Sequence, residues 1–171
     1  MNRAQLFAPL LAVCSLCAYA AFDSAAWFAK RAAYDADAAR LRAAYTNSLA
    51  HVDSPAENVD IPVEKHDDGS VKLSIAAKKA QFFIVEGLIW GEGVCVRKFD
   101  EEGKVTAQID ATHCVIDRVS RSGWVEGHAR VDHRGTVMDG DDVYFSSSNG
   151  YVRVYRNAVI VSDNIKAEGL R

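Results

Sequence analysis

The stretch MDGDDVYFSSSNGYVRVYRNAVI, Met138 to Ile160, holds two runs of β-branched and aromatic residues on either side of Asn149-Gly150. Asn-Gly is a strong hairpin signal, because both central residues of a type I′ turn need a positive φ. A two-residue turn at this point pairs Ser148 with Tyr151 and gives the ribbon two unlike faces. The apolar face then carries Val143, Phe145, Val152 and Val154, and the amphipathic face carries Tyr144, Arg153 and Tyr155.

The sequence upstream of this hairpin follows the same plan. From Val71 onward it shows no helical pattern, and turn signals recur at Glu86-Gly87, Glu101-Glu102-Gly103, Ser120-Arg121-Ser122-Gly123 and His133-Arg134-Gly135. The segments between the turns resemble one another with a period of roughly thirty residues, two strands to each unit. The spacing predicts an all-β domain, built as a meander, a sandwich or a barrel.

Alternation within the predicted strands separates an inner face from an outer one. Val105, Ala107, Ile109 and Ala111 share one face, and polar residues occupy the other. The inward residues are mostly small or β-branched. Taken alone, this pattern favours a filled sandwich core, and the alternative is a groove between sheets that is left open for an apolar ligand.

The N-terminus predicts export. Residues 1–20 have a positive charge at Arg3, an uncharged run and a small-x-small cleavage site ending at Ala20, which together indicate a signal peptide. The alternative is an uncleaved membrane anchor. Residues 21–52 are rich in Ala, Leu and Arg and predict an amphipathic helix, capped by Asp23 or Ser24. Its heptad-like apolar stripe suits either self-association or packing on the chain's own β domain. That stripe comprises Trp27, Tyr34, Ala38, Leu41 and Tyr45.

Residues 53–69 are expected to be a linker because Pro55 and Pro62 disfavour both helix and central strand. The β domain is therefore expected to occupy residues 70–171. Cys95 and Cys114 lie in the part beyond the leader, where a disulfide is permitted, but the expected hairpin places Cys95 opposite Gln108.

The residues give little support to catalysis or to nucleic-acid binding. The net charge of −3 provides no basic surface for nucleic acid. The Asp139–Asp142 run lacks the spacing of a calcium loop and predicts a charged bulge at Gly140 instead. His113, His128, Asp132 and His133 match no standard zinc spacing, and His128 is expected on the outer face. We therefore expect no catalytic site, no metal site and no cofactor.

The β region resembles the LptC/LptA (OstA-like) lipopolysaccharide-transport family. The resemblance covers Val71 to Arg171 and is carried by repeat texture, of which DGDDVYFSSSNGYVRVYRNAVIVSDNIKAEG, Asp139 to Gly169, is the clearest part. An N-terminal segment followed by one short β domain is more similar to LptC than to LptA. The resemblance implies an open twisted β-jelly roll, preceded here by one N-terminal α-helix, in a periplasmic or inner-membrane-anchored protein without enzymatic activity.

The resemblance also implies partners. The ligand would be lipopolysaccharide or a similar amphipathic lipid, and neighbouring β-jelly-roll transport proteins would join by edge-strand pairing. An uncleaved leader would add a membrane contact. The residues expected to contact lipid are the inward-facing Ile75, Val94, Val96, Ile109, Ala129, Val131, Phe145 and Val154. The residues expected at a partner-binding edge are Val161, Ile165 and Ala167.

A second hypothesis belongs to a different functional class. In it the protein is a structural or scaffolding protein of the cell envelope, whose N-terminal helix oligomerises and whose β domain is a filled sandwich. The interior of the β domain distinguishes the two hypotheses, because a lipid carrier needs an open apolar space.

Overall fold

The computed structural model describes the backbone of residues 7–162 and 165–168 and the side chains of residues 25–162. The chain divides into two compact units, Met1–Ala39 and Arg40–Arg171. The first six residues of the predicted leader, and the side chains around its cleavage site at Ala20, lie outside the described residues. The signal-peptide hypothesis therefore stays a prediction.

The N-terminal helix α1 runs from Phe7 to Leu49 without a break. It ends close to the position expected from the sequence, and residues 10–49 contain no Gly or Pro that would interrupt it. The expected N-terminal cap at Asp23 or Ser24 is wrong, because the helix continues through both residues. In the unit that begins at Arg40, Leu41 and Tyr45 are buried, whereas Trp27 and Phe28 in the preceding unit are more than half exposed. Within the described residues, no helix is both long enough and apolar enough to cross a bilayer.

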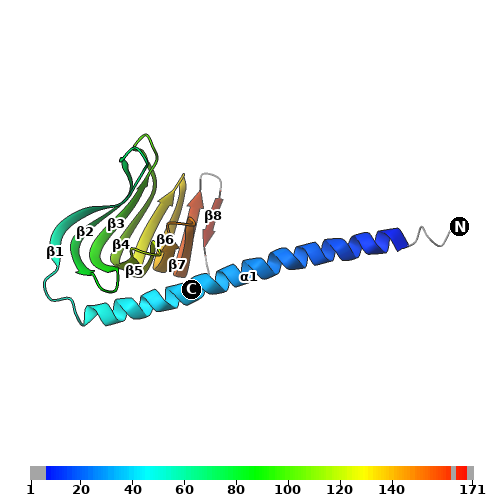
Figure 1. Cartoon of the computed structure of the whole chain (residues 1–171), viewed down its shortest axis with the longest axis horizontal. Coiled ribbons are helices and arrows are strands. Elements are labelled where there is room, and N and C mark those ends of the chain that lie inside the picture. Colours follow the sequence, from blue (N-terminus) through cyan, green and yellow to red (C-terminus); the bar gives the residue numbers. More distant parts are fainter. Residues whose placement is uncertain (1–6, 163–164, 169–171) are drawn as a thin grey trace. The chain divides into compact units, whose positions relative to one another are not determined.

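The described residues form a single eight-stranded antiparallel sheet in which each strand pairs with its neighbours in sequence, from β1 to β8 (Figure 1). The strands are β1 (Ala56–Lys65), β2 (Val71–Phe83), β3 (Leu88–Phe99), β4 (Val105–Asp117), β5 (Ser122–His133), β6 (Thr136–Ser146), β7 (Tyr151–Ser162) and β8 (Ile165–Glu168). The sheet does not close, because β1 and β8 lie at its two edges. The predicted fold class, an open β-jelly-roll-like meander after one helix, is confirmed.

The segment expected to be a linker contains strand β1. Residues 56–65 pair with β2 from Ala56↔Ala80 to Lys65↔Val71, with irregular register around Pro62. A proline lacks the N–H of a ladder hydrogen bond, so it is tolerated at a sheet edge and not in the centre. The inference from Pro62 correctly excluded a central strand, but it should have allowed an edge strand.

The loop between β6 and β7 is two residues longer than predicted. Ser146, not Ser148, pairs with Tyr151, so residues 147–150 form the loop, and of Asn149 and Gly150 only the glycine has a positive φ, 62°. Ser147 donates both its backbone N–H and its hydroxyl to the carbonyl of Arg121 in the next turn, each at 2.9 Å. This contact stabilises the longer loop. A shift of two residues leaves each side chain on its predicted face.

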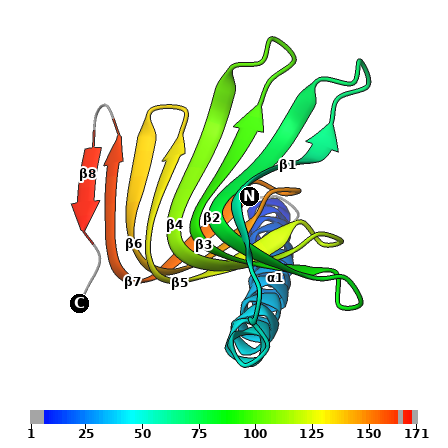
Figure 2. The ribbon, with the colours of Figure 1, turned by 90° about the vertical axis from the view of Figure 1, so that its left-hand side faces the viewer.

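Residues with a positive φ angle form a row across the middle of the sheet. Gly93, Gly127 and Asn157 have φ values of 60°, 80° and 52°, and each lies near the centre of its strand, β3, β5 or β7. The register shifts in β4·β5, β5·β6 and β6·β7 fall in the same region. Bulges bend strands and increase their twist. Figure 2 accordingly shows the strands curving so that their two halves face each other.

At the bulges, polar side chains form hydrogen bonds with backbone groups that have no partner in the strand ladder. The Thr112 hydroxyl lies 3.2 Å from the carbonyl of Glu126 and 3.4 Å from that of His128, on either side of Gly127. The carboxylate of Asp142 accepts the Gly127 N–H at 3.3 Å and the Arg156 Nε–H at 2.6 Å. The charged bulge predicted at Gly140 is not on β6: Gly140 pairs with Ala129, and the extra residues lie on the neighbouring strands, near Gly127 in β5 and Asn157 in β7. Asp142, opposite the β5 bulge, is buried.

The bend divides the sheet into two halves. Half A comprises residues 71–77, 94–99, 105–111, 129–133 and 136–140, and half B comprises residues 80–83, 88–91, 114–117, 122–125, 143–146 and 151–154. The inner face changes phase at the bend: buried side chains step by three residues, from Ala111 to Cys114 in β4, instead of by two. Cys114 therefore faces inward, whereas Cys95 alternates with two core valines and faces outward. These two cysteines do not form a disulfide bond.

The last turns of α1, from Arg40 onward, cover the outer face of half B. Arg40 Nη2 bonds Asp117 Oδ2 at 2.8 Å, and the guanidinium of Arg42 lies 5.5 Å from the Trp124 ring centre. Tyr45 is 7% exposed, and burial, with a smaller contribution from Glu126, raises the pKa of its hydroxyl. For these residues the stripe packs on the chain's own β domain, the second of the two expectations for the helix.

The bend yields a first prediction, at Gly127. A Cβ at φ 80° is strained in any L-residue, so Gly127→Ala should lower the free energy of unfolding by about 1–2 kcal/mol in urea denaturation. Gly127→Asn is the matched control, since asparagine tolerates this conformation and already adopts it at Asn157. Equal losses for the two variants would show that lost space, and not backbone strain, causes the effect.

The contact between helix and sheet yields a second prediction, on pH. Burial alone would raise the pKa of Asp117, but hydrogen bonds from the Ser120 and Val119 N–H groups and from Arg40 outweigh it, and the pKa lies below its ordinary value. A carboxyl with a lowered folded pKa stabilises the fold above its unfolded pKa. Stability should therefore fall as the pH drops from about 5 through about 3.9 and on toward the folded value.

Asp117→Asn should lower the free energy of unfolding at pH 7 by about 1–3 kcal/mol and flatten this acid dependence. Thermal unfolding from pH 7 to pH 3 measures both quantities. Glu101→Gln, in an exposed turn, is the control. If Asp117→Asn loses stability in parallel with the unmodified chain at every pH, the carboxylate is not the titrating group.

Candidate functional site

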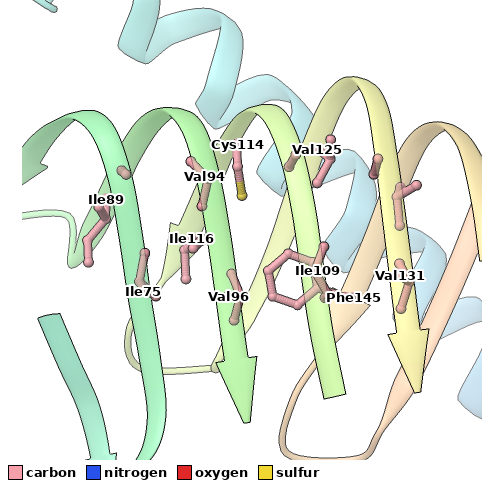
Figure 3. Close-up of a cluster of buried hydrophobic side chains, with 14 of the residues drawn as sticks. Ile75, Ile89, Val94, Val96, Ile109, Cys114, Ile116, Val125, Val131 and Phe145 are labelled. Atoms are coloured by element: carbon pink, nitrogen blue, oxygen red, sulfur yellow. The ribbon is translucent and has the colours of Figure 1, made fainter. Parts of the chain in front are cut away.

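The interior between the two halves of the sheet is lined by rows of side chains that run across neighbouring strands. In half A the row beside the bend is Ala77, Val94, Ala111, Ala129 and Gly140, and the next row is Ile75, Val96, Ile109, Val131 and Met138. Side chains thus become larger with distance from the bend, as the gap between the halves widens. Figure 3 shows members of both rows, Val94 from the first and Ile75, Val96, Ile109 and Val131 from the second, within one cluster of buried side chains.

Near the bend the interior is a packed core. Val125, Val143 and Ala129 are at most 1% exposed, and Cys114 is buried among them. Burial raises the pKa of the Cys114 thiol well above its ordinary value, so this cysteine behaves as a small apolar side chain and not as a nucleophile. The Phe145 ring lies directly over Gly123, where a Cβ would lie within 2.5 Å of ring carbons. The glycine therefore makes room for the ring.

Farther from the bend the two halves no longer fill the space between them. A cavity of about 300 Å³ lies there, between half A and the end of the β6–β7 hairpin. Its walls are Leu73, Val96, Lys98, Ala107, Ile109, Val131, His133, Met138, Phe145, Ser146, Ser147, Gly150, Tyr151 and Val152. This volume is at the lower end of the usual range for small-molecule pockets, and the lining is mainly apolar, as such pockets require.

The residues expected to contact lipid divide between cavity and core. Val96, Ile109, Val131 and Phe145 line the cavity. Ile75, Val94 and Ala129 belong to the packed core, and Val154 packs against it from β7. The structure thus places all eight on the inner face, but only four of them where a ligand could touch them.

Several cavity residues escaped the sequence analysis. Met138 and Leu73 were not assigned, although Leu73 alternates with Ile75 along β2 and Met138 is the third residue of β6, opposite Val131. Val152 was predicted on the apolar face of the hairpin but not among the ligand contacts, and Tyr151 was not assigned. Lys98 and His133 were missed because alternation assigns a face only to apolar residues. Their spacing from Val96 and Val131, two residues along the same strands, was the available signal.

The opening of the cavity carries charge. A small depression beside it is lined by Glu64, Lys72, Lys98, Arg121, Leu73, Ser147 and Ser148, and it shares Leu73, Lys98 and Ser147 with the cavity. We call Glu64, Lys72, Lys98 and Arg121 the mouth. The Glu64 carboxylate receives Lys72 Nζ at 2.8 Å and Arg121 Nη1 at 3.0 Å. The hydrogen bond from Lys72, supported by Arg121, keeps the pKa of Glu64 below its ordinary value.

The remaining titratable clusters lie on outer surfaces. His128 is on the outer face as expected, with Nε2 at 3.1 Å from Asp139 and Nδ1 at 3.5 Å from Asp141. Among the residues that the structure describes, no group of His, Cys, Asp and Glu side chains is arranged to hold a metal ion.

The residues expected at a partner-binding edge occupy two different strands. Val161 is on β7 and pairs with Val137 on one side and Lys166 on the other, so its backbone is not at an edge. Ile165 and Ala167 are on β8, the last strand of the sheet, and their side chains lie outside the described residues.

Comparisons with known proteins leave the family open: a scan against protein-family models finds no match, and a search of curated proteins finds none.

Proposed function

We propose that this protein is a non-enzymatic lipid-binding protein that holds an acyl chain between the two halves of its bent sheet. The observation that carries the proposal is the apolar cavity of about 300 Å³, lined by Val96, Ile109, Val131 and Phe145. Each methylene group transferred from water into such a space contributes about 0.8 kcal/mol, so even a short alkyl chain would bind measurably. The cavity also favours this function over the filled sandwich of a scaffolding protein.

The biological setting that we propose is lipopolysaccharide transport through the periplasm to the outer membrane. Support comes from the LptC/LptA-like repeat texture, the leader-like N-terminus and the open meander with strand edges at β1 and β8. An open edge can pair with a strand of a neighbouring β domain. β1 carries Pro62 and an irregular register, features that protect an edge, so β8 is the better candidate for such pairing.

The direct test of lipid binding is native mass spectrometry of the protein isolated without detergent. We expect a fraction of the protein to carry a co-isolated lipid, which fragmentation would identify. A lipid with several acyl chains would require the two halves of the sheet to separate beyond the observed cavity. Lipid-free protein that also fails to take up dodecyl-chain ligands would reject the proposal.

Filling the cavity gives a third prediction. Ala107 lines the cavity and is only partly buried, so Ala107→Phe should place its ring in the empty space. We expect binding of a dodecyl-chain ligand to fall at least tenfold, while the free energy of unfolding stays the same or rises by about 1 kcal/mol. Calorimetric titration and urea denaturation measure the two effects.

The matched control is Ala76→Phe. Ala76 lies between the inward-facing Ile75 and Ala77 and is therefore on the outer face of the same half-sheet. This variant should bind the ligand as the unmodified chain does. Equal binding by all three proteins would show that the alkyl chain lies elsewhere.

A further inference from the structure

The mouth of the cavity combines three cationic side chains with one carboxylate. Lys72, Lys98 and Arg121 come from β2, β3 and the β4–β5 turn, and Glu64 comes from β1. The depression therefore has a net charge of about +2, although the whole chain has a net charge of −3. This local excess of positive charge lies directly beside an apolar cavity.

The Glu64 carboxylate shows what the mouth accommodates. Two of its cations already converge on one carboxylate from opposite halves of the sheet, Lys72 from half A and Arg121 from the turn at the end of half B. Both cations are partly exposed, at 38% and 44%, so a second anion can reach them. Oxyanions that accept two or more charge-assisted hydrogen bonds are bound strongly, and guanidinium groups suit carboxylate and phosphate oxygens.

Lys98 has a different position from the other two. It lines both the depression and the cavity, and its ammonium group forms no hydrogen bond or ion pair with any residue whose side chain is described. Its charge contributes, after those of Lys72 and Arg121, to the lowered pKa of Glu64, but without a direct ion pair the partly buried ammonium still favours an anion. Lys98 lies one step beyond Val96 along the inner face of β3, so an anion bound to it would be attached to the outer end of a chain lying on Val96.

We propose that the mouth binds the anionic headgroup, phosphate or carboxylate, of a single-chain amphiphile whose alkyl chain occupies the cavity. This inference rests on the proposed function, because it adds a headgroup site to the same cavity. Lys98 is the first contact of the headgroup, and Lys72 and Arg121 close around it. Glu64 competes with the ligand for these two cations. The cavity volume suits one chain, and the positive mouth excludes cationic headgroups.

The test is calorimetric titration of the full chain with four probes below their micellar concentrations. Dodecyl phosphate is the anionic amphiphile, dodecyl maltoside the neutral one and dodecyltrimethylammonium the cationic one, and inorganic phosphate is the headgroup alone. We expect dodecyl phosphate to bind about tenfold or more tightly than dodecyl maltoside, with the excess declining as salt is added. The cationic probe should bind most weakly, and inorganic phosphate should not bind detectably.

Variants assign the selectivity to the mouth. Lys98→Gln should reduce the affinity for dodecyl phosphate about tenfold and leave dodecyl maltoside unchanged, and Lys98→Arg should restore most of the loss. Glu64→Gln should raise the affinity for dodecyl phosphate several-fold, since it frees Lys72 and Arg121 for the ligand. Lys104→Gln, in the exposed β3–β4 turn, is the matched control and should change nothing.

The outcomes separate the two proposals. Equal binding of anionic and neutral probes, or a loss on Lys98→Gln that is the same for both, would overturn the headgroup site and leave the lipid cavity intact. Binding of inorganic phosphate as tight as that of dodecyl phosphate would mean a free-anion site and also overturn it. Failure of every dodecyl probe to bind would reject the proposed function itself.

Discussion

The bend across the middle of the sheet is the constraint on which the rest of this structure depends. A flat meander of these strands would have one apolar face exposed to water along its whole width. By bending, the sheet turns that face onto itself, so the strands bury their own inner side chains without a second sheet. The positive φ values at Gly93, Gly127 and Asn157 supply the bend, and Thr112 and Asp142 satisfy the polar groups that the bulges release.

The gradation of side-chain size along the inner face follows from the same bend. Close to it the two halves are near each other, and Ala77, Ala111 and Ala129 are small enough to fit. One row farther out, Ile75 and Val131 fill a wider gap. The cavity begins at this second row, which contributes Val96, Ile109 and Val131 to its wall, and extends over the third row, where Ala107 leaves space. The empty space is thus a consequence of two diverging surfaces, and its position at the open end gives it access to the charged mouth.

The outer faces of the two halves of the sheet differ in polarity. The outer face of half B is covered by the end of α1, where Arg40 and Arg42 contact Asp117 and Trp124, and the large aromatic residue Tyr144 is buried there at 2% exposure. The outer face of half A carries polar residues such as Asp110 and Arg130 in direct pairing across β4 and β5. Half A therefore needs no cover, and its inner face is the wall of the cavity.

Short-range sequence signals determined the class of this fold. Turn residues at regular spacing and alternating apolar residues were sufficient for an antiparallel meander and for the inner face of residues 105–111, because these features depend on neighbouring residues along the chain. The tertiary structure decided the features that depend on contacts between distant residues. The β6–β7 loop follows its contact with Arg121, and β1 follows its pairing with β2. The division of inward residues between core and cavity follows the widening gap, which no single strand encodes. Glu64 and Lys98 meet at the mouth through strand pairing, because both lie beside Leu73 of β2, whereas Arg121 reaches them from the far end of half B only because the sheet bends.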